Sequence, residues 1–237
     1  MPILVLLLAT TSAALADPPT AEPSADLGYS GSSFFPDARA RTPGSAEVAL
    51  GGFGVLVLPP ANVETVTGEP QTLGGVAVRA AWAPATGVRV EGHLGYASNG
   101  AVLGTVAASA SAALSKTVRL GGYGLCWDTA DPNFWALSGG CGIGVALAAR
   151  WPRWGFDANV PVVMLSDIEG LSSFLPVLMT EAHFTFALGH GHSVRVGSFS
   201  VGPGVGWQFQ GRRLLLRADV HSFGLVSGLR VEAGVPL

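Results

Sequence analysis

The sequence predicts an all-β fold, a closed antiparallel up-and-down transmembrane β-barrel of about 12 strands, with about 10 strands as the alternative. Three observations predict it. Short runs in which apolar and polar residues alternate follow one another from Ala46 to Leu237, and Gly, Pro, Asn and Asp separate them. Only 12% of the residues are charged, about half of what a soluble domain usually carries. The mean hydropathy is positive, at +0.44.

The N-terminal region predicts export. Residues 1–16, "MPILVLLLATTSAALA", contain a short apolar run followed by an Ala14-Leu15-Ala16 cleavage site, which is typical of a signal peptide that is removed. Residues 17–45 are rich in Pro, Ser and Ala without periodicity, so we expect a flexible periplasmic leader outside the fold. A segment that enters the barrel is the alternative. The barrel is then expected over residues 46–237.

Taken in order, the alternating runs predict strands over 46–57, 72–82, 88–97, 101–113, 118–127, 134–149, 154–164, 177–187, 192–201, 203–210, 213–221 and 226–237. Their connections alternate in length. Tight ones such as "PATG" and "GHGH" are interleaved with longer ones such as "PPANVETVTGEPQ". This asymmetry is typical of a membrane barrel, whose turns are short on one side and whose loops are longer on the other.

Two other classes are excluded by composition. The uncharged runs Ala101–Ser115 and Phe134–Ala149 are shorter than the roughly 18 residues of a membrane-spanning helix. The formal net charge of −3 offers no basic excess, so nothing predicts a nucleic-acid partner.

The charged face of each strand is predicted to line the lumen. In the run 88–97, for example, Arg89, Glu91 and His93 alternate with apolar residues. A turn centred between Gly224 and Leu225 would set residue 217 opposite 232 and residue 219 opposite 230, and a turn centred on residue 85 would set 79 opposite 91. All three pairs have opposite charges, which favours an enclosed polar lining over a solvated face. The expected lumen residues are Arg79, Arg89, Glu91, His93, Glu181, His183, Arg217, Asp219, Arg230 and Glu232.

The tryptophans indicate where the membrane interfaces lie. All six fall close to the ends of predicted strands, where an amphipathic ring suits the headgroup level of a bilayer. The expected interface aromatics are Trp82, Trp127, Trp135, Trp151, Trp154 and Trp207.

With its signal peptide, alternating segments, tryptophan placement and closing strand "GLRVEAGVPL", the chain resembles the outer-membrane β-barrel proteins of Gram-negative bacteria over residues 46–237. The resemblance implies an outer-membrane location, contact with outer-membrane lipid, and recognition of the C-terminal strand by the assembly machinery. We expect a porin-like narrow pore or a structural membrane protein with a charge-paired lumen. A lipid-modifying outer-membrane enzyme is one alternative, and a secreted soluble β-sandwich that binds a ligand is another.

Cys126 and Cys141 flank one predicted hairpin loop. In an oxidising compartment such a pair favours a structural disulfide. No His lies nearby to complete a metal site, and Asx-turn chemistry explains the oxygens of Asp128, Asp131 and Asn133 better than calcium does. We therefore expect no metal and no cofactor.

No catalytic constellation is convincing, so we do not expect an enzyme. Outer-membrane phospholipase A and the lipid A deacylases carry His-x-Ser-Asn patterns, but here Tyr96 stands in the His position before Ser98-Asn99-Gly100. Asn-Gly suits a hairpin turn. Glu181 and His183 share a predicted face and could do acid–base chemistry, although lining the lumen explains them better.

Overall fold

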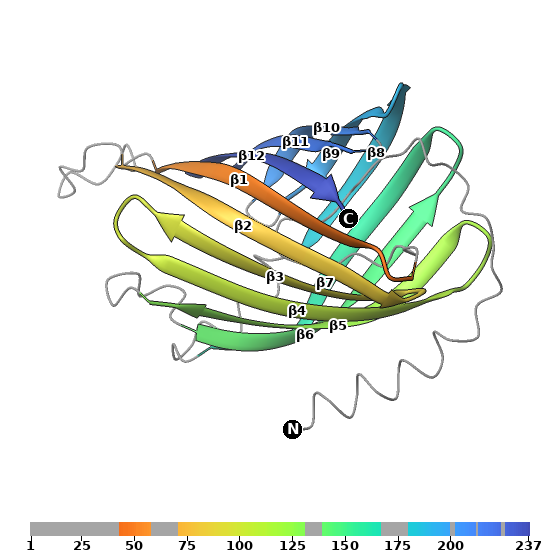
Figure 1. The fold of residues 1–237 in the computed structure, drawn as a ribbon, viewed down its shortest axis with the longest axis horizontal. Coiled ribbons are helices and arrows are strands. Elements are labelled where there is room, and N and C mark those ends of the chain that lie inside the picture. The colour runs from red at the N-terminus through yellow and green to blue at the C-terminus, as the bar shows by residue number, and fades with distance from the viewer. Residues whose placement is uncertain are drawn as a thin grey trace.

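The twelve-strand barrel is confirmed by a computed structural model, which describes residues 43–57, 71–130, 139–166, 180–199, 202–211, 213–223 and 226–237. All strands are antiparallel to their neighbours (Figure 1). They are β1 (Ala46–Val57), β2 (Gln71–Ala85), β3 (Val88–Ala97), β4 (Val102–Ala113), β5 (Val118–Thr129), β6 (Gly139–Arg150), β7 (Trp154–Ser166), β8 (Glu181–Gly189), β9 (His192–Ser198), β10 (Pro203–Gln210), β11 (Leu215–Phe223) and β12 (Val226–Pro236). No helix among the described residues is long and apolar enough to cross a membrane.

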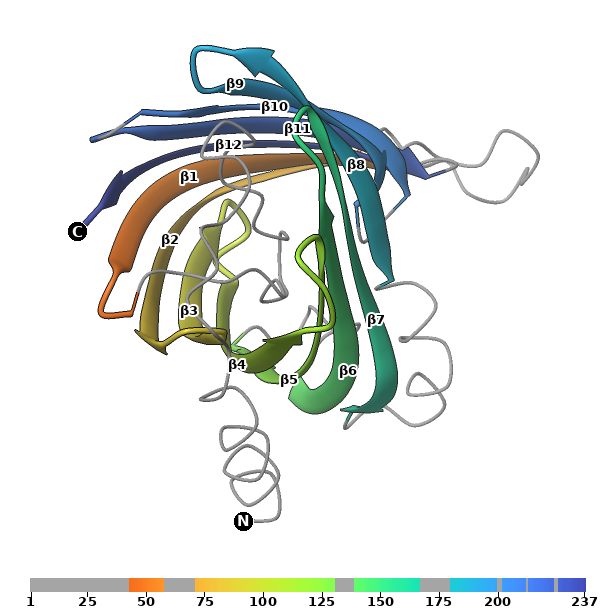
Figure 2. The ribbon, with the colours of Figure 1, turned by 90° about the vertical axis from the view of Figure 1, so that its right-hand side faces the viewer.

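The last strand closes the sheet onto the first. β1 pairs with β12 from Glu47 opposite Pro236 to Val57 opposite Val226, and Figure 2 shows the ring of strands with β1 beside β12. Every other strand pairs with its two neighbours in sequence. Closure satisfies the backbone groups that an edge strand would expose, and it excludes both the two-layer sandwich and the ten-strand alternative.

The two ends of the barrel differ in their connections. At one end, here the short-turn end, β1 begins and β12 finishes, and the connections are 86–87, 114–117, 151–153, 190–191 and 211–214. At the other, the long-loop end, they include 58–70, 130–138 and 167–180. The turn 190–191 has positive φ at His190 (52°) and Gly191 (80°), the backbone that a tight hairpin requires.

The predicted strand ranges agree with the structure within a few residues. β2 continues to Ala85, beyond its predicted end at 82. Gly44 and Ser45, assigned to the leader, hydrogen-bond to the backbone of Ala83 and so extend the sheet. The predicted signal peptide, the rest of the leader and the strand residues 134–138 and 177–179 lie outside the described residues.

Side chains are distributed inside out relative to a soluble protein. Large apolar residues of the outer face are exposed, as at Leu50 (62%), Leu94 (61%) and Val106 (64%), whereas Thr185 and Arg195 on the inner face are 0% exposed. An apolar cluster lies in the interior between β4 and β7, where Tyr123 and other residues of this group pack together. The group consists of Ala107, Tyr123, Leu125, Trp127, Ala146, Ala148 and Met164.

One predicted register is wrong. Arg79 lies opposite His93, not Glu91, which lies opposite Ala81. The turn is Thr86-Gly87, with positive φ at Gly87 (74°), and an irregularity between Trp82 and Ala85 shifts the pairing. Because the shift amounts to two residues on the partner strand, the same side chains still point inward.

Candidate functional site in the barrel interior

A continuous chain of ion pairs runs along the inner wall from β3 to β12. Arg89 contacts Glu91 at 2.9 Å on its own strand and Glu47 of β1 at 2.8 Å. Glu47 also pairs with Arg79 of β2. Arg79 Nε in turn donates to Glu232 Oε1 at 3.0 Å, across the β1–β12 closure. Arg230 completes the chain at 2.6 Å from Glu232 Oε2.

A second cluster centres on Asp219 of β11. Its two carboxylate oxygens accept hydrogen bonds from Arg195 of β9 and from Arg217 of its own strand. The Arg195 guanidinium also lies 5.1 Å from the centre of the Phe199 ring, within the range of a cation–π interaction. One carboxylate thus holds two buried guanidinium groups.

A third cluster joins β6, β7 and β8. Arg150 Nη2 donates to Asp157 Oδ1 at 2.5 Å, and His183 Nε2 lies 3.5 Å from Asp157 Oδ2. The ring of His183 stacks on Phe199, with centroids 5.5 Å apart. Phe199 therefore lies against both His183 of this cluster and Arg195 of the second cluster.

The structure places all ten residues that the sequence predicted for the lumen on the inner face of the barrel. Eight of them are buried, with exposures of 5% or less, while the side chains of His93 and Arg230 are 11% and 18% exposed. The in-register neighbours Arg217–Glu232 and Asp219–Arg230 are those that the sequence predicted. The ion pairs described above, however, mostly run along one strand or diagonally between strands.

Several inner polar residues were missed by the sequence analysis. Glu47 follows Ala46 and precedes Val48, and Arg195 stands between Val194 and Val196, so the alternation rule could have identified both. Asp157 of β7 and Gln208 of β10 also occupy inward positions of the alternating pattern. The remaining missed residue in the clusters is Arg150, at the short-turn end of β6.

Polar side chains on one side of the interior are almost inaccessible to solvent. Arg195, Thr185 and Ser193 are each 0% exposed, and Asp219 and Gln208 are each 1% exposed. In a water-filled channel the lining side chains remain accessible. These five residues come from β8, β9, β10 and β11, so this side of the interior is closed by side chains.

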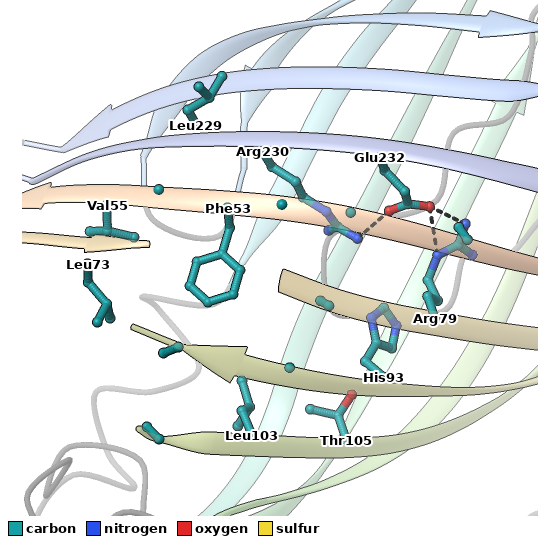
Figure 3. Close-up of a pocket in the computed structure, with 18 of the residues that line it drawn as sticks. Phe53, Val55, Leu73, Arg79, His93, Leu103, Thr105, Leu229, Arg230 and Glu232 are labelled. Atoms are coloured by element: carbon teal, nitrogen blue, oxygen red, sulfur yellow. Dashed lines mark hydrogen bonds and ion pairs between the residues drawn. The ribbon is translucent and has the colours of Figure 1, made fainter. Parts of the chain in front are cut away.

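A cavity of about 280 Å³ lies toward the long-loop end (Figure 3). Its wall is largely apolar and includes Phe53, Val55, Leu73, Leu103 and Phe199. At its inner end lie the charged or titratable groups Arg79, His93, Arg230 and Glu232. We call this cavity the vestibule.

Four predicted interface tryptophans gather at one end of the barrel. Trp82, Trp154 and Trp207 are 52%, 36% and 36% exposed, and Trp151 stacks on Trp154 with ring centroids 3.9 Å apart. Trp82, Trp154 and Trp207 lie at or near the short-turn end of their strands, and Trp151 lies in the connection 151–153 at the same end. They are therefore positioned as a girdle at that rim.

Trp127 corrects the prediction of an interface position. It is 7% exposed and belongs to the apolar cluster inside the barrel. Side chains alternate along β5, so Trp127 lies on the same inner face as Tyr123 and Leu125. Its ring lies over Gly140, where a Cβ would overlap it. Trp135 lies outside the described residues.

The predicted disulfide is confirmed. Cys126 of β5 and Cys141 of β6 are directly opposite each other and are bonded. Both lie on the outer face, next to the connection 130–138 at the long-loop end. The disulfide thus joins the two strands that carry this connection.

The candidate catalytic residues differ in their surroundings. Ser98 lies in a tight turn, where its Oγ accepts from the backbone N–H of Gly74 at 3.2 Å, and Asn99 Oδ1 accepts from the N–H of Ala101 at 3.1 Å. Glu181 and His183 share the inner face of β8 but are 1% and 2% exposed. Among the described residues no group of three or more His, Cys, Asp or Glu side chains could hold a metal ion.

Solved structures share the fold of this chain at very low sequence identity. KdgM porin in complex with disordered oligogalacturonate matches with a TM-score of 0.56 and 6% identity over 81% of this chain and 98% of that one. KdgM porin matches with a TM-score of 0.54 and 6% identity over 79% and 98%. Outer membrane phospholipase A from Escherichia coli follows, with a TM-score of 0.47 and 10% identity over 83% and 98%.

No family model matches the chain, and no curated protein sequence matches it. At 6% identity the similarity to KdgM porin shows the fold alone. That fold is the closed β-barrel of the KdgM porin structures.

Proposed function

We propose that this protein spans the bacterial outer membrane as a β-barrel whose lumen is closed by buried ion pairs. It would serve as a structural membrane protein or a tightly closed narrow pore. The observation that carries the proposal is the inner polar layer, in which Arg195, Thr185 and Ser193 are 0% exposed.

The outer face supports the membrane location. Its exposed large side chains are almost all apolar, and they occur on every strand, from Leu50 on β1 to Val231 on β12. A water-soluble protein rarely exposes apolar surface of this extent, whereas the hydrocarbon of a bilayer requires it. The tryptophan girdle at the short-turn end suits a membrane interface.

The inner face supports a closed lumen. On the β8–β11 side, Arg195 and Asp219 pair with each other and are nearly inaccessible to water, so an ion that crossed there would have to separate them. Removing one partner from a buried pair leaves an uncompensated charge, which is costly in a medium of low dielectric. The inner ion pairs also combine both signs, so we propose no preference for polyanions of the kind named in the KdgM porin complex.

Ion conductance of the purified protein in planar lipid bilayers tests this proposal. We expect the native barrel to show no steady conductance, and the double variant Arg195→Ala/Asp219→Ala to conduct, because it removes both side chains of this pair from the inner polar layer, while Arg217 loses its partner Asp219. Steady conductance of the native barrel would overturn the closed lumen. Heat-modifiable gel migration of the same samples shows that both proteins are folded, and recovery of the native protein without detergent would overturn the membrane location.

We also propose that the C-terminal strand is the segment read by the outer-membrane assembly machinery. On β12, Leu229, Val231 and Val235 alternate outward, with exposures of 49%, 50% and 49%. Replacing Val235 with Asp should reduce the amount of barrel assembled in cells, whereas the same change at Ser227, near the long-loop end of the strand, should have little effect. Equal assembly of both variants would contradict this role.

The proposal includes no catalytic role. The tight turn around Ser98 and the burial of Glu181 and His183 support this. Release of fatty acid from phospholipid vesicles, measured with the purified barrel, should not exceed that of protein-free vesicles. Hydrolysis abolished by Ser98→Ala or His183→Ala would favour the lipid-modifying alternative.

A further inference from the structure

We propose that the vestibule binds a free single-chain anionic amphiphile, with its alkyl chain against the apolar wall and its head at the charged inner end. This goes beyond the proposed function, because binding in the vestibule does not require the lumen to open.

The wall determines the chemistry of the ligand body. Phe53 and Val55 of β1, Leu73 of β2 and Leu103 of β4 all face this cavity, and Leu103 also packs against the apolar cluster between β4 and β7. The inner face of a membrane barrel is usually polar, so a water channel does not account for these apolar side chains. Apolar surface that faces a cavity is favourably buried against an alkyl chain.

The shape of the wall depends on residues without side chains. Gly51 and Gly95 both belong to the inner face of the vestibule. A Cβ at Gly95 would meet its nearest atoms only at 3.7–3.9 Å, so the position tolerates a side chain sterically. The space beside Gly95 is therefore open, and no local clash explains why this position has no side chain.

The inner end determines the charge of the ligand head. Arg79, Arg230 and Glu232 lie together there, two guanidinium groups with one carboxylate. Arg79 also pairs with Glu47, so these four side chains are formally neutral, and the two guanidinium donors are what favours an anionic head. The side chain of Arg230, at 18% exposed, is the most accessible of the three.

His93 also lies at the inner end of the vestibule. Its buried Nε2 lies 3.8 Å from Glu91 Oε1. The imidazole nitrogen is therefore directed at Glu91, and the donors for an anionic head are the guanidinium groups.

The volume limits the size of the ligand. About 280 Å³ is close to the lower end of the roughly 300–1,000 Å³ range of small-molecule sites. One medium-length alkyl chain suits this space, whereas a two-chain phospholipid does not. We therefore choose decanoate as the probe.

Photo-cross-linking of the full protein in phospholipid nanodiscs tests the proposal. The probe is decanoate with a diazirine at the end of its chain, and mass spectrometry locates the labelled residues. We expect labelling of inner residues such as Leu73 and Leu103. Excess unlabelled decanoate should suppress it, and decanol, which lacks the anionic head, should compete at least about tenfold less well, because a hydrogen bond to a charged group is lost.

Two glycine variants separate the vestibule from the lipid-facing surface. Gly95→Leu places a side chain in the vestibule and should reduce inner labelling at least about tenfold. Gly104→Leu is the control, because residue 104 points outward next to Leu103, the partner of Gly95, and it should leave inner labelling unchanged.

Arg230→Gln should weaken competition by decanoate but not by decanol. Labelling confined to outward residues such as Val106 would overturn the proposal, as would inner labelling that persists in Gly95→Leu. Heat-modifiable migration confirms that each variant is folded, and bilayer conductance tests closure of the lumen separately.

Discussion

Asp219 of β11 accepts a hydrogen bond from Arg195 of β9, although β10 lies between their two strands. Gly206 of β10 makes this contact possible, because it is in register with both residues and has no side chain. A Cβ at this position would overlap Asp219 Oδ1. A single glycine thus allows the central ion pair of the barrel to form across a strand.

The Gly206→Ala variant should therefore be less stable. We expect a loss of about 1–3 kcal/mol in the free energy of unfolding, as for other overpacked interiors, measured by urea titration of the barrel in lipid vesicles. Gly104→Ala is the matched control, because a Cβ there would meet nothing within 4 Å. Equal stability of the two variants would show that the glycine is not needed for the ion pair.

Loss of the Asp219 carboxylate should be more damaging. Asp219→Ala leaves the buried guanidinium groups of Arg195 and Arg217 without their shared partner, and breaking a buried pair costs about 3–5 kcal/mol. The same urea titration measures this loss. Asp128→Asn, on an exposed residue of β5, should change the free energy by less than about 0.5 kcal/mol. A loss below that of the control would argue against a tightly packed ion pair.

The outer face can be tested with a charge at two depths. Val106, near the middle of β4, and Leu114, in the turn after it, are 64% and 65% exposed. Arg should cost about 2–4 kcal/mol at residue 106 but only about 0–1 kcal/mol at residue 114, because the penalty on a lipid-facing side chain falls toward the interface. Refolding into vesicles measures both values. Two small, equal costs would indicate that water and not lipid contacts this face.

The disulfide should stabilise the barrel. It closes a segment with a sequence separation of 15 residues, for which the reduction in unfolded-state entropy is worth about 3 kcal/mol. The double variant Cys126→Ala/Cys141→Ala should lose roughly this amount, as measured by guanidinium titration. Addition of a reductant should destabilise the native protein and leave the variant unaffected, and a response of the variant to the reductant would indicate an effect unrelated to this bond.

Fluorescence quenching distinguishes rim tryptophans from interior ones. A protein that retains only Trp154 should be quenched strongly by lipids that carry a quencher near the headgroup, because its ring lies at the short-turn rim. A protein that retains only Trp127 should be quenched weakly at every depth, since its ring is inside the barrel. Strong quenching of the Trp127 protein would contradict its inward orientation.

Much of the fold follows from local pattern. The period-2 alternation identifies the strands and, on each strand, the face that carries charge. For example, Arg217 and Glu232 were predicted as neighbours because both the alternation and the two-residue loop at 224–225 are evident in the sequence. The position of Arg79 relative to Glu91 was not predicted correctly, because the turn is Thr86-Gly87 and is not centred on Ala85, and because an irregularity between Trp82 and Ala85 shifts the pairing by one residue.

By itself, the sequence located the strands, favoured twelve of them over ten and indicated which face of each strand carries charge, because these features depend on neighbouring residues along one strand or hairpin. Only the closed barrel decided that Arg79 meets Glu232 and that Arg195 meets Asp219, because those contacts join residues 153 and 24 positions apart. The vestibule also required the tertiary structure, since its apolar wall combines β1, β2 and β4 with Phe199. Alternation indicates which way a side chain points, whereas closure and register determine which side chains it meets across the interior.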